Sequence, residues 1–573
     1  MDEKSLDKSE TLLPSESSRL GWLPEMRAVL SAALLWAAFP PNNLWFLGWV
    51  AMVPFLGIWV DMPNLSRRRM LRVSLTGGMT FWLLAINWVR LSDPSAWVGW
   101  LVMSLALAVW WPVMSLLVWQ LHRKRQWPLV ASWVVVWGFQ EFGREYYLSG
   151  FPWYYLAHTQ YRQVWLIQVA DIGGTTVISL LMIAINAIIA EWFFGGQPGW
   201  RQASQSWKKA AVISATSLLF VIIYSQYRLN TASFTEGPRV ALLQSDIPQS
   251  RRLNPDHNEL IETYRRLTQK ALDQHVKAFP NGNSVIDAII WPETSFPYPI
   301  LVGDPSLDEL SYKKVMKEYI DSDEAVNEWY AHRNDSQEMM TAWAEQARSA
   351  IIVGANAWDI SPAGFRKYNT AMMFQPKSKP DHYYKMHLVP FGEYIPWTDF
   401  LPIIAELAPF PPDQRPNLKH GPEAHILTLG NKWRIAPLIC FEDTVPHVVR
   451  RFFAFTGGNK PIVGKIDFFV NISNDGWFRG SEEHETHLAG SIFRCVETRT
   501  AMVRSVNTGI SAIIDGNGQV VSEIPVGRED VLLGNVPIDS RSCLYRLWGD
   551  ISGILSLLLT LLGCLIGNPK TKE

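Results

Sequence analysis

The sequence is poor in cysteine, in net charge and in leader-like features. Its 573 residues include four cysteines, Cys440, Cys495, Cys543 and Cys564, and no two of them form a C-x-x-C pair. A disulfide framework is therefore not expected. The formal net charge is -1, which gives no reason to expect a nucleic-acid partner. No small-residue cleavage site follows the first apolar run, so this run is expected to be a retained anchor.

What the sequence has in quantity is apolar and aromatic surface. Hydrophobic residues make up 48% of the chain, and there are 28 Trp. Trp is enriched where protein meets a membrane–water interface, although a Trp-rich core is the alternative. Eight runs are long enough, or nearly so, to predict membrane-spanning helices. They cover residues 27–40, 43–61, 71–91, 97–120, 127–140, 164–194, 210–228 and 547–567, with breaks expected at Pro40-Pro41 and at Gly173-Gly174.

Basic residues between these runs predict the orientation of the chain. With a cytoplasmic N-terminus, all the basic loops fall on one side: Arg67 to Arg72, His122 to Arg125, Arg201 to Lys209, and Lys570 with Lys572. The positive-inside rule then places both termini in the cytoplasm and residues 230–540 outside. We therefore expect a cytoplasmic tail (1–26), a seven-helix membrane domain (27–229), an extracytoplasmic domain (230–543), and an eighth span with a cytoplasmic C-terminus (544–573).

The extracytoplasmic domain carries short apolar runs interleaved with helical patterns, which is typical of a layered α/β fold. Strands are predicted near residues 239–244, 285–291, 351–355, 434–440, 467–473, 500–505 and 511–514, and helices near 256–275, 337–350 and 481–499. Three chemically capable residues, Glu293, Lys385 and Cys440, each follow a probable strand. Functional groups gather at the carboxyl ends of strands in α/β sheets. A carboxylate that takes the thiol proton and an ammonium that stabilises an oxyanion would make the thiol a nucleophile.

Taken singly, each of these residues has an ordinary structural interpretation. A lone Glu or Lys is usually a solvated surface residue, and a lone Cys at a strand end is usually a small core residue. The prediction of a catalytic site therefore depends on the three residues meeting.

At these segments the sequence resembles the nitrilase superfamily and, within it, the apolipoprotein N-acyltransferases. The order Glu293, Lys385, Cys440 is similar to the superfamily's triad. Four further segments also resemble the family: LQSDIPQ at 243–249, HLVPFGEYIP at 387–396, NISNDGWF at 471–478 and NTGISA at 507–512. The resemblance covers nearly the whole chain. It implies a multi-span α-helical membrane domain joined to an α-β-β-α sandwich.

The resemblance also implies roles and partners. Glu293 corresponds to the general base, Lys385 to the oxyanion-stabilising lysine and Cys440 to the nucleophile. Glu393 and Glu442 match supporting carboxylates, while Phe441 departs from the Tyr that the family often has there. The implied reaction is a ping-pong transfer of an acyl chain from a membrane phospholipid, through a thioester on Cys440, to a diacylglyceryl-modified apolipoprotein. The implied location is the cytoplasmic (inner) membrane, with the catalytic domain on the periplasmic side and no cofactor.

Three segments carry further expectations. Residues 301–336 are interpreted as an insertion, either a surface elaboration or a partner contact. Residues 397–410 are apolar and aromatic, which favours a mobile lid that dips into the membrane interface, although a core segment is the alternative. The loop 140–163 is expected to face outward, as interface decoration or as part of a lipid access site.

Other functions remain open from the residues alone. A membrane-tethered amidase or nitrilase could use the same triad to hydrolyse C–N bonds, and a non-catalytic membrane scaffold is a second alternative. His484, Glu485 and His487 have spacing that a metal site could use, but no third partner is evident, so no metal is expected.

Overall fold

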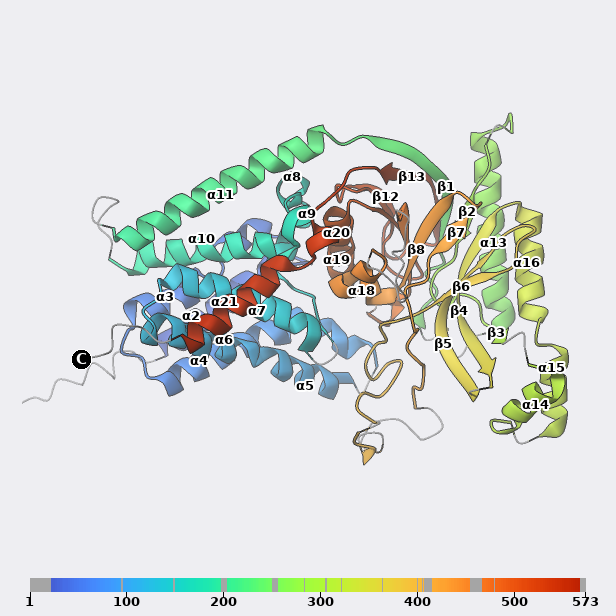
Figure 1. Ribbon diagram of the computed structural model, residues 1–573, viewed down its shortest axis with the longest axis horizontal. Coiled ribbons are helices and arrows are strands. Elements are labelled where there is room, and N and C mark those ends of the chain that lie inside the picture. The colour runs from blue at the N-terminus through green and yellow to red at the C-terminus, as the bar shows by residue number, and fades with distance from the viewer. Residues whose placement is uncertain are drawn as a thin grey trace, which may run out of the picture.

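The computed structural model describes residues 22–566, apart from residues 94–95, 148–149, 197–202, 250–255, 283, 304–306, 321, 363, 399, 404–405, 407–414, 454–465 and 479. The chain forms a helical domain and an α/β domain, placed end to end (Figure 1). The helical domain consists of α2 (Leu23–Ala38), η1 (Trp45–Trp49), α3 (Val53–Asp61), α4 (Arg67–Ala85), η2 (Asn87–Leu91), α5 (Ala96–Ala108), α6 (Trp110–Val118), η3 (Trp119–Lys124), α7 (Leu129–Tyr146), η5 (Leu156–Gln160), α8 (Val164–Ile167), α9 (Ala170–Gly173), α10 (Thr176–Phe194), α11 (Gln205–Asn230) and the late helix α21 (Ile551–Leu565).

Every one of the eight predicted apolar segments contains a helix. Within the described residues, Ala96–Lys124, Thr176–Phe194 and Gln205–Asn230 are long and apolar enough to cross a membrane, and Trp45–Asp61, Val164–Gly173 and Ile551–Leu565 are shorter apolar helices. The two predicted breaks are present. Helix α2 ends just before Pro40-Pro41, and α9 ends at Gly174, whose φ of 85° suits glycine.

The expectation of an outward-facing loop over residues 140–163 is wrong for much of that segment. Helix α7 continues to Tyr146, and Glu141, Arg144 and Glu145 on it are buried. The Arg144 guanidinium donates to the carbonyl of Trp153 at 2.9 Å, and Trp153 is itself buried. These polar side chains find partners inside the protein, which is why their charge did not mark a solvent-exposed loop.

The α/β domain is built on two sheets. The first has the order β13-β1-β2-β4-β5-β6, with β3 paired to β4, and the second has the order β12-β11-β10-β9-β8-β7. The strands are β1 (Phe234–Gln244), β2 (Ala288–Ile290), β3 (Ile300–Gly303), β4 (Ala350–Ser361), β5 (Gly364–Phe374), β6 (Asp381–Tyr384), β7 (Leu427–Leu429), β8 (Trp433–Ile439), β9 (Phe468–Ser473), β10 (Ala501–Val506), β11 (Ser511–Ile514), β12 (Val520–Ile524) and β13 (Asp530–Asp539). All seven predicted strands are present, whereas β3, β5, β6, β7, β12 and β13 were not predicted.

Helices cover the outer face of each sheet and produce four layers. On the first sheet, α13 (His257–Ala278) and α16 (Asp335–Ala347) bury Tyr264 and Met340 against strand residues such as Ile351. On the second sheet lie α18 (Pro446–Arg451) and α19 (Glu483–Thr498), on the side of the helical domain (Figure 1). The Ser505 hydroxyl lies between the sheets, 2.9 Å from the carbonyl oxygens of both Leu243 and Ile290. The three predicted helices of this domain are confirmed.

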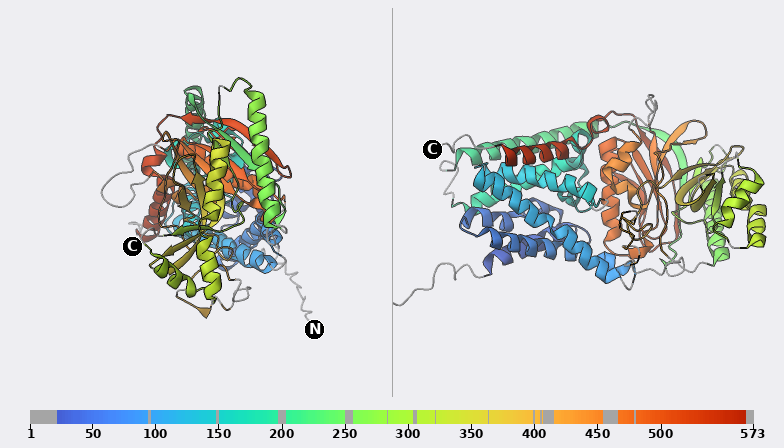
Figure 2. Two further views of the ribbon diagram at one scale, coloured as in Figure 1. Left: turned by 90° about the vertical axis from the view of Figure 1, so that its right-hand side faces the viewer. Right: turned by 60° about the horizontal axis from the view of Figure 1, so that its bottom comes forward.

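The segment interpreted as an insertion forms two short helices, α14 (Glu309–Lys317) and α15 (Asp323–Ala331). They have a small apolar core of their own, made by Leu301, Tyr312, Met316, Val326 and Ile360. Both helices lie at the pole of the molecule opposite the helical domain (Figures 1 and 2). The insertion is therefore remote from the helical domain.

Candidate active site

The structure places all three candidate residues directly after strands. Glu293 follows β2, Lys385 follows β6 and Cys440 follows β8. The first two strands belong to one sheet and β8 to the other, so the site forms where the ends of the two sheets meet. Glycine is required beside Glu293, because a Cβ on Gly354 would lie 2.5 Å from the Glu293 Cα.

Lys385 is held by two carboxylates. Its ammonium lies 2.9 Å from Glu393 Oε1 and 3.4 Å from Glu293 Oε1, and the side chain is fully buried. The Asn369 amide donates to the same two oxygens, at 2.7 Å to Glu293 and 2.9 Å to Glu393. We call Lys385, Glu293 and Glu393, with Asn369 between the two carboxylates, the lysine cluster.

The electrostatics of the lysine cluster set the charge of its members. Burial raises the pKa of Glu293, against the opposing effect of the Lys385 ammonium. Burial alone would lower the pKa of Lys385, but the Glu393 and Glu293 carboxylates outweigh it and hold that pKa above its ordinary value. Lys385 is therefore a permanent cation, and Glu293 is a carboxylate that accepts a proton more readily than usual.

Cys440 begins a tight turn, η7 (Cys440–Thr444), with a left-handed backbone φ of 55°. A non-glycine residue in this region is strained, and such strain clusters at functional sites. The Asn471 amide donates to the Cys440 carbonyl at 2.9 Å, which helps to hold the turn. Burial and the nearby Glu293 carboxylate raise the pKa of the Cys440 thiol, against the effect of Lys385. The resting thiol is therefore protonated, and its reaction requires a base.

Glu442 acts on the backbone of the site. Its carboxylate accepts from the backbone N–H groups of Met386 at 2.8 Å, His387 at 2.9 Å and Ile439 at 2.9 Å, and from the Tyr383 hydroxyl at 3.0 Å. One side chain thus ties the segment after Lys385 to the strand before Cys440. Burial raises its pKa to about 7.

Phe441 lies against the same segment. Its ring packs against His387, with ring centroids 5.2 Å apart, and the Lys385 ammonium lies 5.6 Å from its centroid. A ring at this position therefore contacts the lysine cluster without a hydroxyl group.

A second group of charged residues lies beneath the nucleophile turn. Asp443 pairs with Arg504 and accepts from His487 Nε2 at 2.8 Å, and Asp475 lies 3.3 Å from His487 Nδ1. Glu483 and His484 complete the group, with 3.2 Å between His484 Nδ1 and Glu483 Oε2. We call these six residues, all buried, the arginine cluster.

The arginine cluster is balanced in charge. Burial alone would lower the pKa of His487, but Asp443 outweighs it and raises the pKa to about 10. The pKa of His484 is likewise about 10, because Asp475 and Glu483 outweigh burial. Two imidazolium ions and one guanidinium therefore face three carboxylates.

The histidine-rich segment departs from the arrangement that its spacing suggested. His484 and His487 lie in the arginine cluster, whereas the Glu485 carboxylate points away and accepts from Asn43, Tyr161 and Arg162. The residues whose possible ligand atoms lie within 4.8 Å of one another are Asp475, Glu483 and His487. Ion pairing accounts for these contacts.

Several site residues were not singled out from the sequence. Asn369 and Tyr383 lie on β5 and β6, two strands that were not predicted. Arg504 lies on a predicted strand but reads there as an interruption of an apolar run. A buried polar residue between apolar neighbours is the one signal that marked them.

Comparisons with known proteins agree with this geometry. The family described as apolipoprotein N-acyltransferase N-terminal domain matches residues 31–188, and the carbon-nitrogen hydrolase family matches residues 239–542. The chain belongs to the apolipoprotein N-acyltransferase family. It is an acyltransferase with a nitrilase-like catalytic domain.

Relatives span the chain from end to end. An apolipoprotein N-acyltransferase from Geobacter metallireducens is 28% identical over 92% of both chains, and one from Rhodopirellula baltica is 26% identical over 90% of this chain and 92% of the relative. Among solved structures, a CN-hydrolase superfamily protein from Xanthomonas campestris is 18% identical, with a TM-score of 0.33 over 53% of this chain and 91% of its own. An amidase from Nesterenkonia sp. AN1 is 14% identical, with a TM-score of 0.33 over 53% of this chain and 92% of its own.

Proposed function

We propose that the protein N-acylates the diacylglyceryl-cysteine N-terminus of apolipoproteins, with a membrane phospholipid as the acyl donor and a thioester on Cys440 as the intermediate. The observation that carries this proposal is the lysine cluster beside Cys440. A protonated thiol, a base with a raised pKa and a fixed cation are the three groups that acyl transfer through a thiol needs.

In the first step, the Cys440 sulfur attacks an ester carbonyl of the phospholipid while Glu293 accepts the thiol proton. Lys385 stabilises the negative charge that develops on the carbonyl oxygen. When the tetrahedral intermediate collapses, the ester C–O bond breaks and Glu293 returns the proton to the leaving oxygen. The products are a thioester and a lysophospholipid.

In the second step, the α-amine of the acceptor attacks the thioester, and Glu293 accepts a proton from that amine. The C–S bond breaks, the sulfur leaves and takes the proton back from Glu293, and an amide has formed. Glu393 supports both steps because it anchors Lys385 at 2.9 Å and accepts from the Val389 N–H at 2.8 Å. Ping-pong kinetics are the expected result.

The membrane arrangement is part of the proposal. The domain boundaries and the eight spans are those predicted above, with the catalytic domain on the periplasmic side of the inner membrane. In support, the start of α11 and the end of α21 both lie at the pole remote from the catalytic domain, next to basic sequence (Figure 1). Acyl chains cannot leave a bilayer cheaply, at about 0.8 kcal/mol per exposed CH₂. The thiol must therefore work at the membrane surface.

The proposed lid is described only in part, because residues 399, 404–405 and 407–410 lie outside the described residues. The side chains of Trp397, Phe400, Leu401 and Ile403 are exposed, Phe400 by 84%. Four exposed apolar side chains within seven residues favour contact with lipid over core packing. Replacing Phe400 and Leu401 by Ser should slow phospholipid turnover more than alkylation of Cys440; equal rates for the variant and the parent would exclude a lid.

The decisive experiment is the intact mass of the full-length protein after incubation with a phospholipid of defined acyl chains. We expect the mass to rise by one acyl group, and hydroxylamine to remove that group. The Cys440→Ala variant should show no added mass. If no adduct forms in the parent protein while a small amide is hydrolysed to ammonia, the protein is a membrane-tethered amidase instead.

A further inference from the structure

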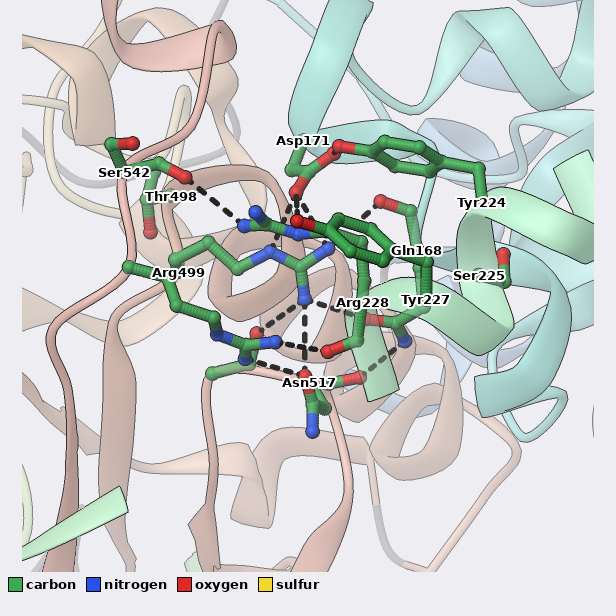
Figure 3. Close-up of polar contacts among 12 residues, drawn as sticks. Gln168, Asp171, Tyr224, Ser225, Tyr227, Arg228, Thr498, Arg499, Asn517 and Ser542 are labelled. Carbon is green, nitrogen blue, oxygen red and sulfur yellow. Dashed lines mark hydrogen bonds and ion pairs between the residues drawn. The ribbon is translucent and has the colours of Figure 1, made fainter. Parts of the chain in front are cut away.

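A third polar network lies where the helical domain meets the catalytic domain, and Arg499 is at its centre (Figure 3). The Arg499 guanidinium is fully buried. Its Nε donates to Asp171 Oδ2 at 2.8 Å, and its Nη2 donates to the Gln168 carbonyl at 2.9 Å. Its Nη1 donates to Gln168 Oε1 at 2.5 Å and to Asn517 Oδ1 at 3.2 Å. One side chain of the catalytic domain therefore holds both ends of the segment between α8 and α9.

The same network also holds the last turns of α11. Asp171 accepts from the Tyr224 hydroxyl at 2.8 Å and pairs with Arg228 at 2.9 Å. Arg228 in turn donates to the Ser542 carbonyl at 3.0 Å, just before the chain returns to the helical domain. The network thus gathers both connections between the domains, α11 to β1 and β13 to α21.

The backbone at Arg499 shows that its side chain is needed there. Residue 499 has a φ of 46° and follows α19 as its C-cap. Glycine or asparagine is the usual residue in this left-handed conformation, and other residues cost about 1 kcal/mol. An arginine at this position offsets that cost through its contacts with the other domain.

Arg499 is also connected to the active site. It lies two residues before β10, which carries Arg504, and Arg504 pairs with Asp443 in the nucleophile turn. The next residue, Ser505, donates to the carbonyl at the end of β2, the strand that precedes Glu293. Strand β10 thus joins the domain contact to both halves of the site.

We propose that Arg499 is a positioning residue that fixes the Cys440 site relative to the helical domain. It governs reaction with substrates held in a bilayer, and it leaves reaction with water-soluble substrates almost unchanged. The proposal rests on the proposed function, because it requires that the acyl donor be a membrane lipid. A misplacement of the site by about 1 Å can cost about 100-fold in rate.

The test compares two acyl donors on the full-length protein in lipid nanodiscs. One donor is the phospholipid of the nanodisc, and the other is a water-soluble short-chain p-nitrophenyl ester. For Arg499→Lys we expect kcat/KM for the phospholipid to fall about 10-fold or more. We expect the soluble ester and the alkylation of Cys440 by iodoacetamide to change less than about twofold.

Two further variants keep the test decisive. Tyr224→Phe removes only the hydroxyl donated to Asp171, so it should fold normally and show a smaller loss confined to the phospholipid. Arg266→Lys alters an exposed pair with Glu529 inside the catalytic domain and should change neither rate. Equal losses on both donors for Arg499→Lys and Tyr224→Phe would show a purely structural role and overturn the proposal, as would no loss on either. If the unaltered protein accepts only the soluble ester, the proposed function itself fails, and this inference fails with it.

Discussion

The lysine cluster and the arginine cluster lie on either side of the nucleophile turn and use similar residues in opposite ways. In the lysine cluster one ammonium faces two carboxylates. In the arginine cluster three cations face three carboxylates, because His484 and His487, whose pKa values are about 10, are protonated at neutral pH. The first has an excess negative charge and the second has none.

This difference separates chemistry from support. A buried carboxylate that is not fully neutralised holds a proton easily, so Glu293 can take one from a thiol and give it back. A balanced buried cluster gains nothing from a change of protonation, and it holds its elements in one geometry. We therefore expect changes in the lysine cluster to alter rate, and changes in the arginine cluster to alter stability.

The largest effect on rate should come from Cys440 itself. Cys440→Ala removes the nucleophile, so acyl transfer should fall by at least about 10⁴-fold, as it does when a covalent nucleophile is deleted. The arginine cluster is untouched, so the unfolding temperature in detergent should stay close to that of the parent. A variant that loses its fold together with its activity would break the separation between the two clusters.

Glu293→Gln should have the next largest effect. Loss of the base should lower the rate by about 10²–10⁴-fold. In the unaltered protein the rate should rise with pH as Glu293 deprotonates, with an apparent pKa above the ordinary value for Glu because burial raises it. Gln cannot titrate, so this acid limb of kcat/KM against pH should disappear. An acid limb that survives in Glu293→Gln would assign it to another group.

Asp443→Asn tests the arginine cluster. It leaves Arg504 and His487 without their carboxylate, and removal of one partner from a buried ion pair costs about 3–5 kcal/mol. Thermal unfolding of the full-length protein measures this loss. Asp323→Asn is the matched control, because the exposed pair between Asp323 and Lys317 is worth at most about 1 kcal/mol. Equal unfolding temperatures for the two variants would contradict the stabilising role.

Much of the lysine cluster could be predicted from the sequence. Glu293, Lys385 and Cys440 each stand after a short apolar run, and the carboxyl ends of strands are where α/β folds expose polar groups. Glu393 and Glu442 were expected near the site only through the family resemblance. The structure places Glu393 on Lys385 and shows that Glu442 binds backbone N–H groups. That second role follows from how three segments meet, which no local pattern encodes.

The arginine cluster and the domain contact could not be predicted, because their residues come together only in the folded chain. Asp443 and Arg504 lie 61 residues apart in sequence, and Asp171 and Arg499 lie 328 apart. Glu141, Arg144 and Glu145 misled in the same way, because charge in an apolar region reads as a solvent-exposed loop until internal partners are known. Strands β5 and β6 were missed because polar residues such as Asn369 and Lys367 interrupt their apolar pattern.

The smallest expected effect is a pH dependence of stability that belongs to the arginine cluster alone. The pKa of His487 is raised from about 6.5 to about 10 in the folded protein. Its contribution to stability is therefore fully present below about pH 6.5 and is lost as pH rises through 10. The unfolding temperature of the parent protein should fall steadily between these values. In His487→Asn it should start lower and change less over the same range, because that titration is gone. His332→Asn, at an exposed pair with Asp335 far from the site, should follow the parent curve. Parallel curves for His487→Asn and the parent would show that the imidazolium of His487 does not support the nucleophile turn.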